Sequence, residues 1–100
     1  MTYTLAPFVT AEMLEKEGFK TEKDDDGDGN IAVVDYTKTF FSKKVKGAYV
    51  PFVSIGYVVI DADTNELWID RNPSFNGECN EQINPFIQDL IDKKMVIVNG

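Results

Sequence analysis

Hydrophobic and polar residues alternate along much of this chain with the period of β-strands, and two stretches have the spacing of helices instead. The longer helical stretch carries apolar residues at i, i+3, i+4, i+7 and i+8: Ile83, Phe86, Ile87, Leu90 and Ile91. Asn84 followed by Pro85 predicts a capped start there, and Asn80 would start the helix one turn earlier. The pattern predicts an amphipathic helix with one buried stripe.

A shorter helix is predicted near the start of the chain. Thr10 is a good N-cap residue, and Gly18 stands where a left-handed residue commonly ends a helix. Val9 and Leu14 have the spacing of a hydrophobic staple across the first turn. The helix is therefore expected from Ala11 to Glu17.

Strands are predicted where β-branched and aromatic residues concentrate, at 19–23, 31–41, 48–60, 67–69 and 95–98. Pro51 lacks a ladder donor and Gly56 permits a bulge, so an edge position or a break is expected near one of them. Residues 70–80 are polar and contain Pro and Gly, which predicts a loop. The expected fold is a single α+β domain over residues 1–100. Its antiparallel sheet of about four to five strands would carry an N-terminal and a C-terminal helix.

Many aromatic residues fall on the predicted strands: Tyr36, Phe40, Phe41, Tyr49, Phe52, Tyr57 and Trp68. Because half of each strand must face the helices, we interpret these aromatic residues as core. The alternative is that they stack on a ligand or on bases, as on other aromatic-bearing sheets. The net charge of −7 disfavours nucleic acid as that ligand.

The composition excludes several classes of function. Seventeen acidic against ten basic residues disfavour an anionic membrane surface as well as nucleic acid. The chain has no histidine, so Ser-His-Asp and Cys-His catalysis are excluded, and its single cysteine, Cys79, cannot form an internal disulfide. The longest apolar runs are too short to span a membrane, and no basic segment leads into an apolar one at the start. We therefore expect a cytoplasmic protein that is not an enzyme and has no organic cofactor.

The densest acidic stretch is Asp24-Asp25-Asp26-Gly27-Asp28-Gly29-Asn30. It resembles a calcium-binding loop, in which Asp24, Asp26 and Asp28 with the carbonyl of Asn30 would supply oxygen ligands. Asp35 stands at the twelfth position, where such loops carry a bidentate Glu. The alternative is a solvated hairpin turn in which these residues serve turn formation. Calcium binding is the second functional hypothesis.

A second acidic turn contains Asp61, Asp63, Asn65 and Glu66, with Glu66 where a calcium loop needs glycine. Turn formation by Asp and Asn explains it without a metal. Phe75 lies in the predicted loop that follows, where an aromatic residue either anchors a partner or folds back onto the core.

Residues 55–67 combine a glycine, a β-rich run, the segment Asp61-Ala62-Asp63-Thr64-Asn65-Glu66 and a further strand, and an amphipathic helix comes later. Over residues 50–92 this arrangement resembles small immunity proteins of bacterial polymorphic toxin systems. The resemblance implies a cytosolic protein that neutralises a partner by tight binding, and it assigns no residue roles.

The sequence as a whole favours a non-enzymatic protein-binding module, an inhibitor or immunity-like protein, including a phage-encoded one. An acidic face would bind a basic surface of another protein. The residues expected to make that contact are Asp24, Asp25, Asp26, Asp28, Asp61, Asp63, Glu66 and Phe75.

Overall fold

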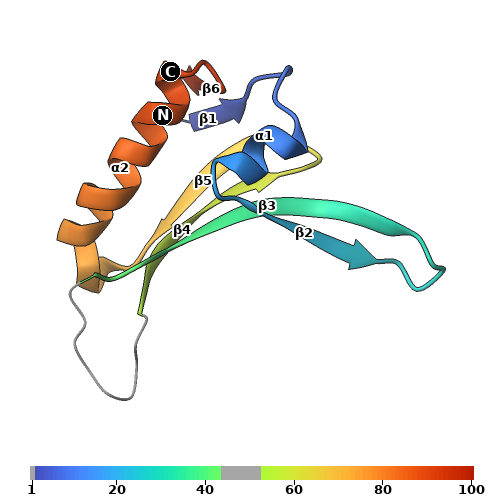
Figure 1. The fold of residues 1–100 in the computed structure, drawn as a ribbon, viewed down its shortest axis with the longest axis horizontal. Helices are drawn as coiled ribbons and strands as arrows, with labels where there is room; N and C mark the ends of the chain where they lie inside the picture. The colour runs from blue at the N-terminus through green and yellow to red at the C-terminus, as the bar shows by residue number, and fades with distance from the viewer. Residues whose placement is uncertain (1, 44–52) are drawn as a thin grey trace.

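The computed structural model describes residues 2–43 and 53–100, and within them one antiparallel six-stranded sheet carries two helices (Figure 1). The sheet order is β2-β3-β4-β5-β1-β6. The elements in chain order are β1 (Thr2–Leu5), α1 (Ala11–Lys16), β2 (Lys20–Asp25), β3 (Ile31–Phe41), β4 (Ser54–Asp61), β5 (Glu66–Arg71), the 3-10 turn η1 (Pro73–Phe75), α2 (Asn76–Asp92) and β6 (Val96–Asn99). The α+β prediction is confirmed, with more strands than expected.

The additional strand is β1, which local sequence pattern does not predict. It is four residues long, and it pairs with β6 on one side and with β5 on the other. Leu5 is buried in the core at its end. Long-range pairing, rather than local propensity, therefore makes this segment a strand.

The first helix has the predicted ends. The Thr10 side chain accepts a hydrogen bond from the main-chain N–H of Met13, and Gly18 has a φ of +95°. The main-chain N–H of Phe19 then donates to the carbonyl of Leu14 at 3.0 Å, which turns the chain into β2.

The second helix begins earlier than predicted. The structure places its start at Asn76, so the loop expected up to residue 80 is wrong for η1 and the first turn of α2, and Pro85 lies inside the helix. The reason is tertiary packing. Glu78 and Cys79 are buried in this first part of α2, and their contacts outweigh the Pro and Gly residues that locally favour a loop. None of the described helices is both long and apolar enough to cross a membrane.

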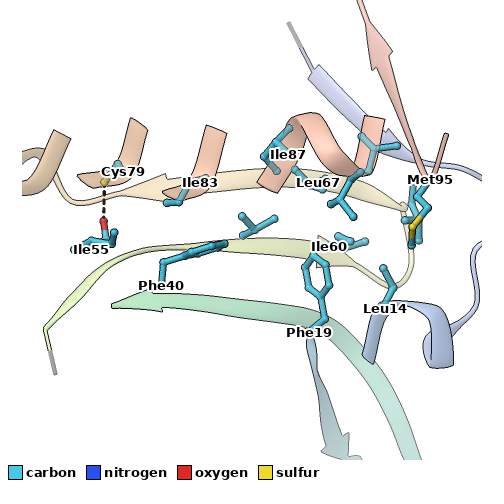
Figure 2. Packing of buried hydrophobic residues seen from close by; sticks show 14 residues of the cluster. Leu14, Phe19, Phe40, Ile55, Ile60, Leu67, Cys79, Ile83, Ile87 and Met95 are labelled. Atoms are coloured by element: carbon cyan, nitrogen blue, oxygen red, sulfur yellow. Dashed lines mark hydrogen bonds between the residues drawn. The ribbon is translucent and has the colours of Figure 1, made fainter. Parts of the chain in front are cut away.

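The hydrophobic core lies between α2 and one face of the sheet, with α1 closing its end (Figure 2). Ile83, Ile87 and Leu90 are fully or almost fully buried, and Phe86 and Ile91 pack against the cluster. The predicted stripe of α2 is therefore confirmed. This packing covers one face of the sheet, which we call the covered face.

An edge position or a break was expected near Pro51 or Gly56, and β4, an inner strand of the sheet, has a bulge next to Gly56. The register with β3 shifts between Phe40, opposite Gly56, and Phe41, opposite Ser54, so that Ile55 is the additional residue and is fully buried. A Cβ atom on Gly56 would lie 2.3 Å from the main-chain oxygen of Asp70, so only glycine fits. The carbonyl of Ile55 accepts a hydrogen bond from the Cys79 thiol at 3.1 Å (Figure 2). Pro51 lies outside the described residues.

Candidate functional site

Neither of the two described helices, α1 and α2, lies over the second face of the sheet, and we call it the open face. Because side chains alternate along a strand, the residues between the core positions of β3, β4 and β5 point to this face. They are Asp35, Thr37 and Thr39 on β3, Tyr57, Val59 and Asp61 on β4, and Glu66, Trp68 and Asp70 on β5. This surface contains the largest exposed aromatic side chains of the described strands.

The exposed aromatic residues correct an expectation from sequence. Trp68 is 45% exposed, Phe41 46% and Tyr57 37%, so the interpretation of these three as core is wrong. Phe40 is buried and Tyr36 packs against the core, as expected. The sequence could not separate the two groups, because both faces of β3 and β4 carry apolar residues. Tyr49 and Phe52 lie outside the described residues.

Val59 forms the floor between the exposed residues of the open face. It is directly opposite Trp68 on β5 and Thr37 on β3, and it is only 5% exposed although neither α1 nor α2 covers this face. An apolar floor beside an exposed indole ring is the local chemistry of a protein-binding anchor point.

A row of carboxylates crosses the open face next to this aromatic area. Glu22 pairs with Asp35, and Asp35 pairs with Asp61, so three acidic residues on neighbouring strands share one face. Ile60 of β4 pairs with Leu67 of β5, and this register places Glu66 of β5 next to Asp61 of β4. Like charges directly opposite one another destabilise a sheet, so this row costs stability unless a partner neutralises it.

Along β5, the open face presents Glu66, Trp68 and Asp70 in alternation. Asp70 lies directly opposite Tyr57 on the neighbouring strand, and hydrogen bonding to its carboxylate, with its negative charge, raises the pKa of Tyr57 above its usual value. The indole ring of Trp68 is thus flanked by carboxylates along its own strand. Such a ring attracts a cationic side chain through both its π-face and its neighbours.

The first acidic loop forms the tip of a hairpin that projects from the rest of the molecule (Figure 1). Residues 31–33 of β3 pair with β2 alone, because the pairing of β3 with β4 begins at Asp35. Ile31 is 69% exposed on this arm, and Asp24, Asp25, Asp26 and Asp28 are all exposed. The acidic tip is therefore accessible to a partner from several directions.

The geometry of the tip is that of a tight turn. The Asp26 carboxylate accepts hydrogen bonds from the main-chain N–H of Asp28 at 2.8 Å and from the main-chain and side-chain nitrogens of Asn30. The Asp28 and Asn30 bonds hold the pKa of Asp26 below its usual value. Gly27 and Gly29 have φ values of +88° and +85°, which the turn requires.

The calcium hypothesis stays a prediction. Asp24 lies on β2 opposite Ala32, and the Asp26 carboxylate accepts the turn's own hydrogen bonds. Asp35 lies within β3, where its carboxylate accepts a hydrogen bond from the Thr37 hydroxyl. In residues 2–43 and 53–100, no three acidic or cysteine side chains are gathered in a group that could hold a metal ion.

The second acidic turn has the same local chemistry. The Asp61 carboxylate accepts hydrogen bonds from the main-chain N–H groups of Asp63 and Thr64, and Asn65 has a φ of +61°. Because β3 and β4 are antiparallel, the β2–β3 and β4–β5 turns lie at the same end of the sheet. The predicted acidic residues from both turns therefore belong to one end of the molecule.

Phe75 lies at the opposite end of the sheet from the acidic turns. It is half-buried in η1 and packs against the core, which is the second of the two placements expected for it. Lys38 is on the covered face with its Nζ 4.2 Å from the centre of the Phe86 ring. Burial lowers the pKa of this ammonium group, and the nearby Glu17 carboxylate opposes that shift.

Comparisons with protein-family models, with curated proteins and with solved structures find no match. The resemblance to immunity proteins stays a prediction.

Proposed function

We propose that this chain is a non-enzymatic protein-binding module, an inhibitor or immunity-like protein, that uses its open face and acidic end to bind a basic surface of another protein. The observation that carries the proposal is the uncovered sheet face on which Trp68 and Tyr57 stand beside a row of carboxylates. Among the described residues, the hydrophobic core cluster contains neither Trp68 and Tyr57 nor the row of carboxylates.

The aromatic area would supply most of the binding energy. Trp and Tyr are the residue types that most often dominate a protein interface, especially where they lie near its centre and exclude water. Trp68 lies next to the floor formed by Val59, so a partner side chain that packs here would lose its contact with water. Loss of the indole ring is then expected to speed dissociation.

The acidic end would contribute mainly to the rate of association. The net charge of −7 and the two acidic turns at one end attract a basic surface over a distance of about 10 Å at 0.1 M salt. Four carboxylates at the tip of a projecting arm reach an approaching partner first. A basic, nucleic-acid-binding enzyme would be a suitable partner, with these carboxylates occupying the place of phosphates.

The test begins by isolating the bound protein from the native lysate and measuring its association and dissociation rates with purified chain. Replacing Asp24, Asp25, Asp26 and Asp28 together with Asn should slow association about tenfold or more at low salt and weaken its salt dependence. Dissociation should change much less. The matched control replaces four acidic residues outside the hairpin tip, Glu12, Glu15, Glu81 and Asp92, with the corresponding amides.

The second variant in this test is Trp68→Ala. It should weaken binding by about 2 kcal/mol or more, mostly through faster dissociation. The proposal is wrong if Trp68→Ala leaves the affinity unchanged, or if neutralising the tip and neutralising the control set slow association equally.

A further inference from the structure

The two outer edges of the sheet differ in their charge. Strands β2 and β6 are the edge strands of the described sheet. Every residue of β2 except Thr21 is charged, whereas β6 consists of Val96, Ile97, Val98 and Asn99 and has no charged residue. Charged side chains are a common device that keeps an edge strand from pairing with another chain. The edge at β2 has this protection, and the edge at β6 lacks it.

The main chain of β6 directs hydrogen-bonding groups to its outer side. The N–H of Ala6 donates to the carbonyl of Met95 at 2.8 Å, so Met95 faces β1. Because main-chain groups alternate in direction along an antiparallel strand, Ile97 also faces β1, and Val96 and Val98 face away from it. The register of β1 concerns only the inner side of β6. On the outer side, none of the described residues pairs with β6.

Apolar side chains stand on both faces of this edge. Val96 is buried and pairs with the buried Leu5, so Val96 and Val98 point to the covered face and Ile97 points to the open face. Ile97 is 46% exposed and Val98 is 41% exposed. A strand added to β6 would therefore cover apolar surface on both faces of the sheet while its main chain pairs with Val96 and Val98.

The strand itself is a suitable partner for a second copy of β6. If Ile97 lies opposite Ile97 of the second copy, Val96 lies opposite Val98 of that copy, so each β-branched side chain meets another. The two Val96–Val98 pairs would exchange main-chain hydrogen bonds, and the Ile97 pair would lie on the two-fold axis as a non-hydrogen-bonded pair. The same edge then serves both copies.

The distribution of charge allows such a pairing. Two copies that each carry a net charge of −7 repel one another unless their acidic parts stay apart. The sheet order places β2 and the acidic tip of the β2–β3 hairpin at the opposite side of the sheet from β6 (Figure 1). Pairing of two β6 strands would therefore place the two tips at the far ends of one continuous sheet. Salt screens charges so separated, because its screening length is about 10 Å at 0.1 M.

We propose that the outer edge of β6 is the interface of a two-fold symmetric homodimer, in which the two β6 strands pair antiparallel about Ile97. The proposal rests on this edge alone and not on the proposed function. A strand of four residues buries little area, so the dimer is weak, with a dissociation constant of about 10–100 μM.

Sedimentation equilibrium tests the dimer. The mass of the wild-type chain should rise from 11.3 kDa toward twice that value as its concentration is raised to about 1 mM. Ile97→Lys should weaken self-association about tenfold or more, because two ammonium groups would meet at the axis. Ile31→Lys is the matched control, since it makes the same change at an exposed isoleucine of the hairpin arm and should leave the dimer intact. Circular dichroism checks that both variants fold.

A charge swap tests which residues meet at the axis. Ile97→Lys and Ile97→Glu should each be monomeric alone, and an equal mixture of the two should dimerise, because opposite charges then face one another. A wild-type chain that stays monomeric at about 1 mM would overturn the homodimer and leave the edge to a strand of another protein. Equal weakening by Ile97→Lys and Ile31→Lys, or a mixture that stays monomeric, would overturn the interface at β6.

A disulfide tests the register. Ile97→Cys should form a covalent dimer with oxidised glutathione, because the Cα atoms of a non-hydrogen-bonded pair lie about 4.5 Å apart, within the range of a disulfide. Asn99→Cys is the control, since its two copies would lie four positions apart along the strands, about 13 Å. The native Cys79 is buried and does not compete. Equal cross-linking of the two variants would overturn the pairing about Ile97.

Discussion

The two faces of the sheet have similar alternating sequences but different surroundings. On β4, Val58 and Ile60 are completely buried under α2, whereas Tyr57 is 37% exposed on the other face. The covered face gains its stability from a helix that lies along it, and the open face retains exposed aromatic side chains that are not part of the described core. The difference indicates that one face serves folding and the other is available for recognition.

The carboxylates sharpen this contrast. On the covered face, the described buried carboxylate, that of Glu78, has two hydrogen-bond donors. On the open face, Glu22, Asp35 and Asp61 are placed opposite one another without a basic residue between them. The open face therefore carries like charges at opposite positions, an arrangement that costs stability in a sheet.

The largest expected effect is on stability, from one large-to-small substitution on each face. Leu90→Ala should lower the free energy of unfolding by about 2–5 kcal/mol, because it removes a completely buried side chain of α2. Trp68→Ala should lower it by about 1 kcal/mol or less, because the ring is only partly buried. Urea denaturation followed by circular dichroism measures both. Equal losses would show that Trp68 belongs to the core and that the contrast between the faces is wrong.

A smaller effect is expected at the start of α2. The buried Glu78 carboxylate accepts hydrogen bonds from the Ser42 hydroxyl at 2.8 Å and from the N–H of Lys43 at 3.1 Å, joining α2 to the end of β3. Glu78→Ala should destabilise the protein by about 1–3 kcal/mol, because donors at this end lose a buried acceptor. Glu78→Gln retains one acceptor oxygen and should cost less. If the two variants unfold at the same urea concentration, the carboxylate does not hold this end of the helix.

The smallest effect is a titration on the open face. Asp70 raises the pKa of Tyr57, so Asp70→Asn should bring that pKa back toward the usual value near 10. The folded pKa is raised, so this hydrogen bond stabilises the fold below the ordinary tyrosine pKa and loses that effect as pH rises through the folded pKa. Ultraviolet absorbance of tyrosinate measures the shift, with Asp63→Asn as the control. An unchanged titration curve would mean that Tyr57 and Asp70 do not interact.

The sequence predicted the elements whose signals are local. The cap at Thr10, the left-handed Gly18 and the apolar stripe of α2 were all found, because each depends on residues a few positions apart. The start of α2 was missed because Asn84 and Pro85 give a strong local signal, whereas the burial of Glu78 depends on contacts from β3. The strand β1 was missed for the same reason.

The candidate site was predicted in part. The two acidic turns could be recognised in the sequence from their Asp and Glu residues. Antiparallel pairing of the strands then brings both turns to one end of the sheet. The aromatic area was not predicted, because alternation reveals two faces but not which one receives the helix. Phe40 and Phe41 are adjacent in sequence and chemically identical, and only the position of α2 makes one buried and the other exposed.

The pairing of β1 also has a consequence for the order of folding. Its partners are β5 and β6, and the contact between Thr4 and Asn99 spans 95 positions. During synthesis, β1 has no strand to pair with until β5 has left the ribosome, and its outer edge stays open until β6 follows. The β2–β3 hairpin can form early from local contacts. Pairing of β1 with β5 and β6 instead closes a long loop of chain, which costs conformational entropy. Folding should therefore begin in the middle of the chain and end where its first and last strands meet.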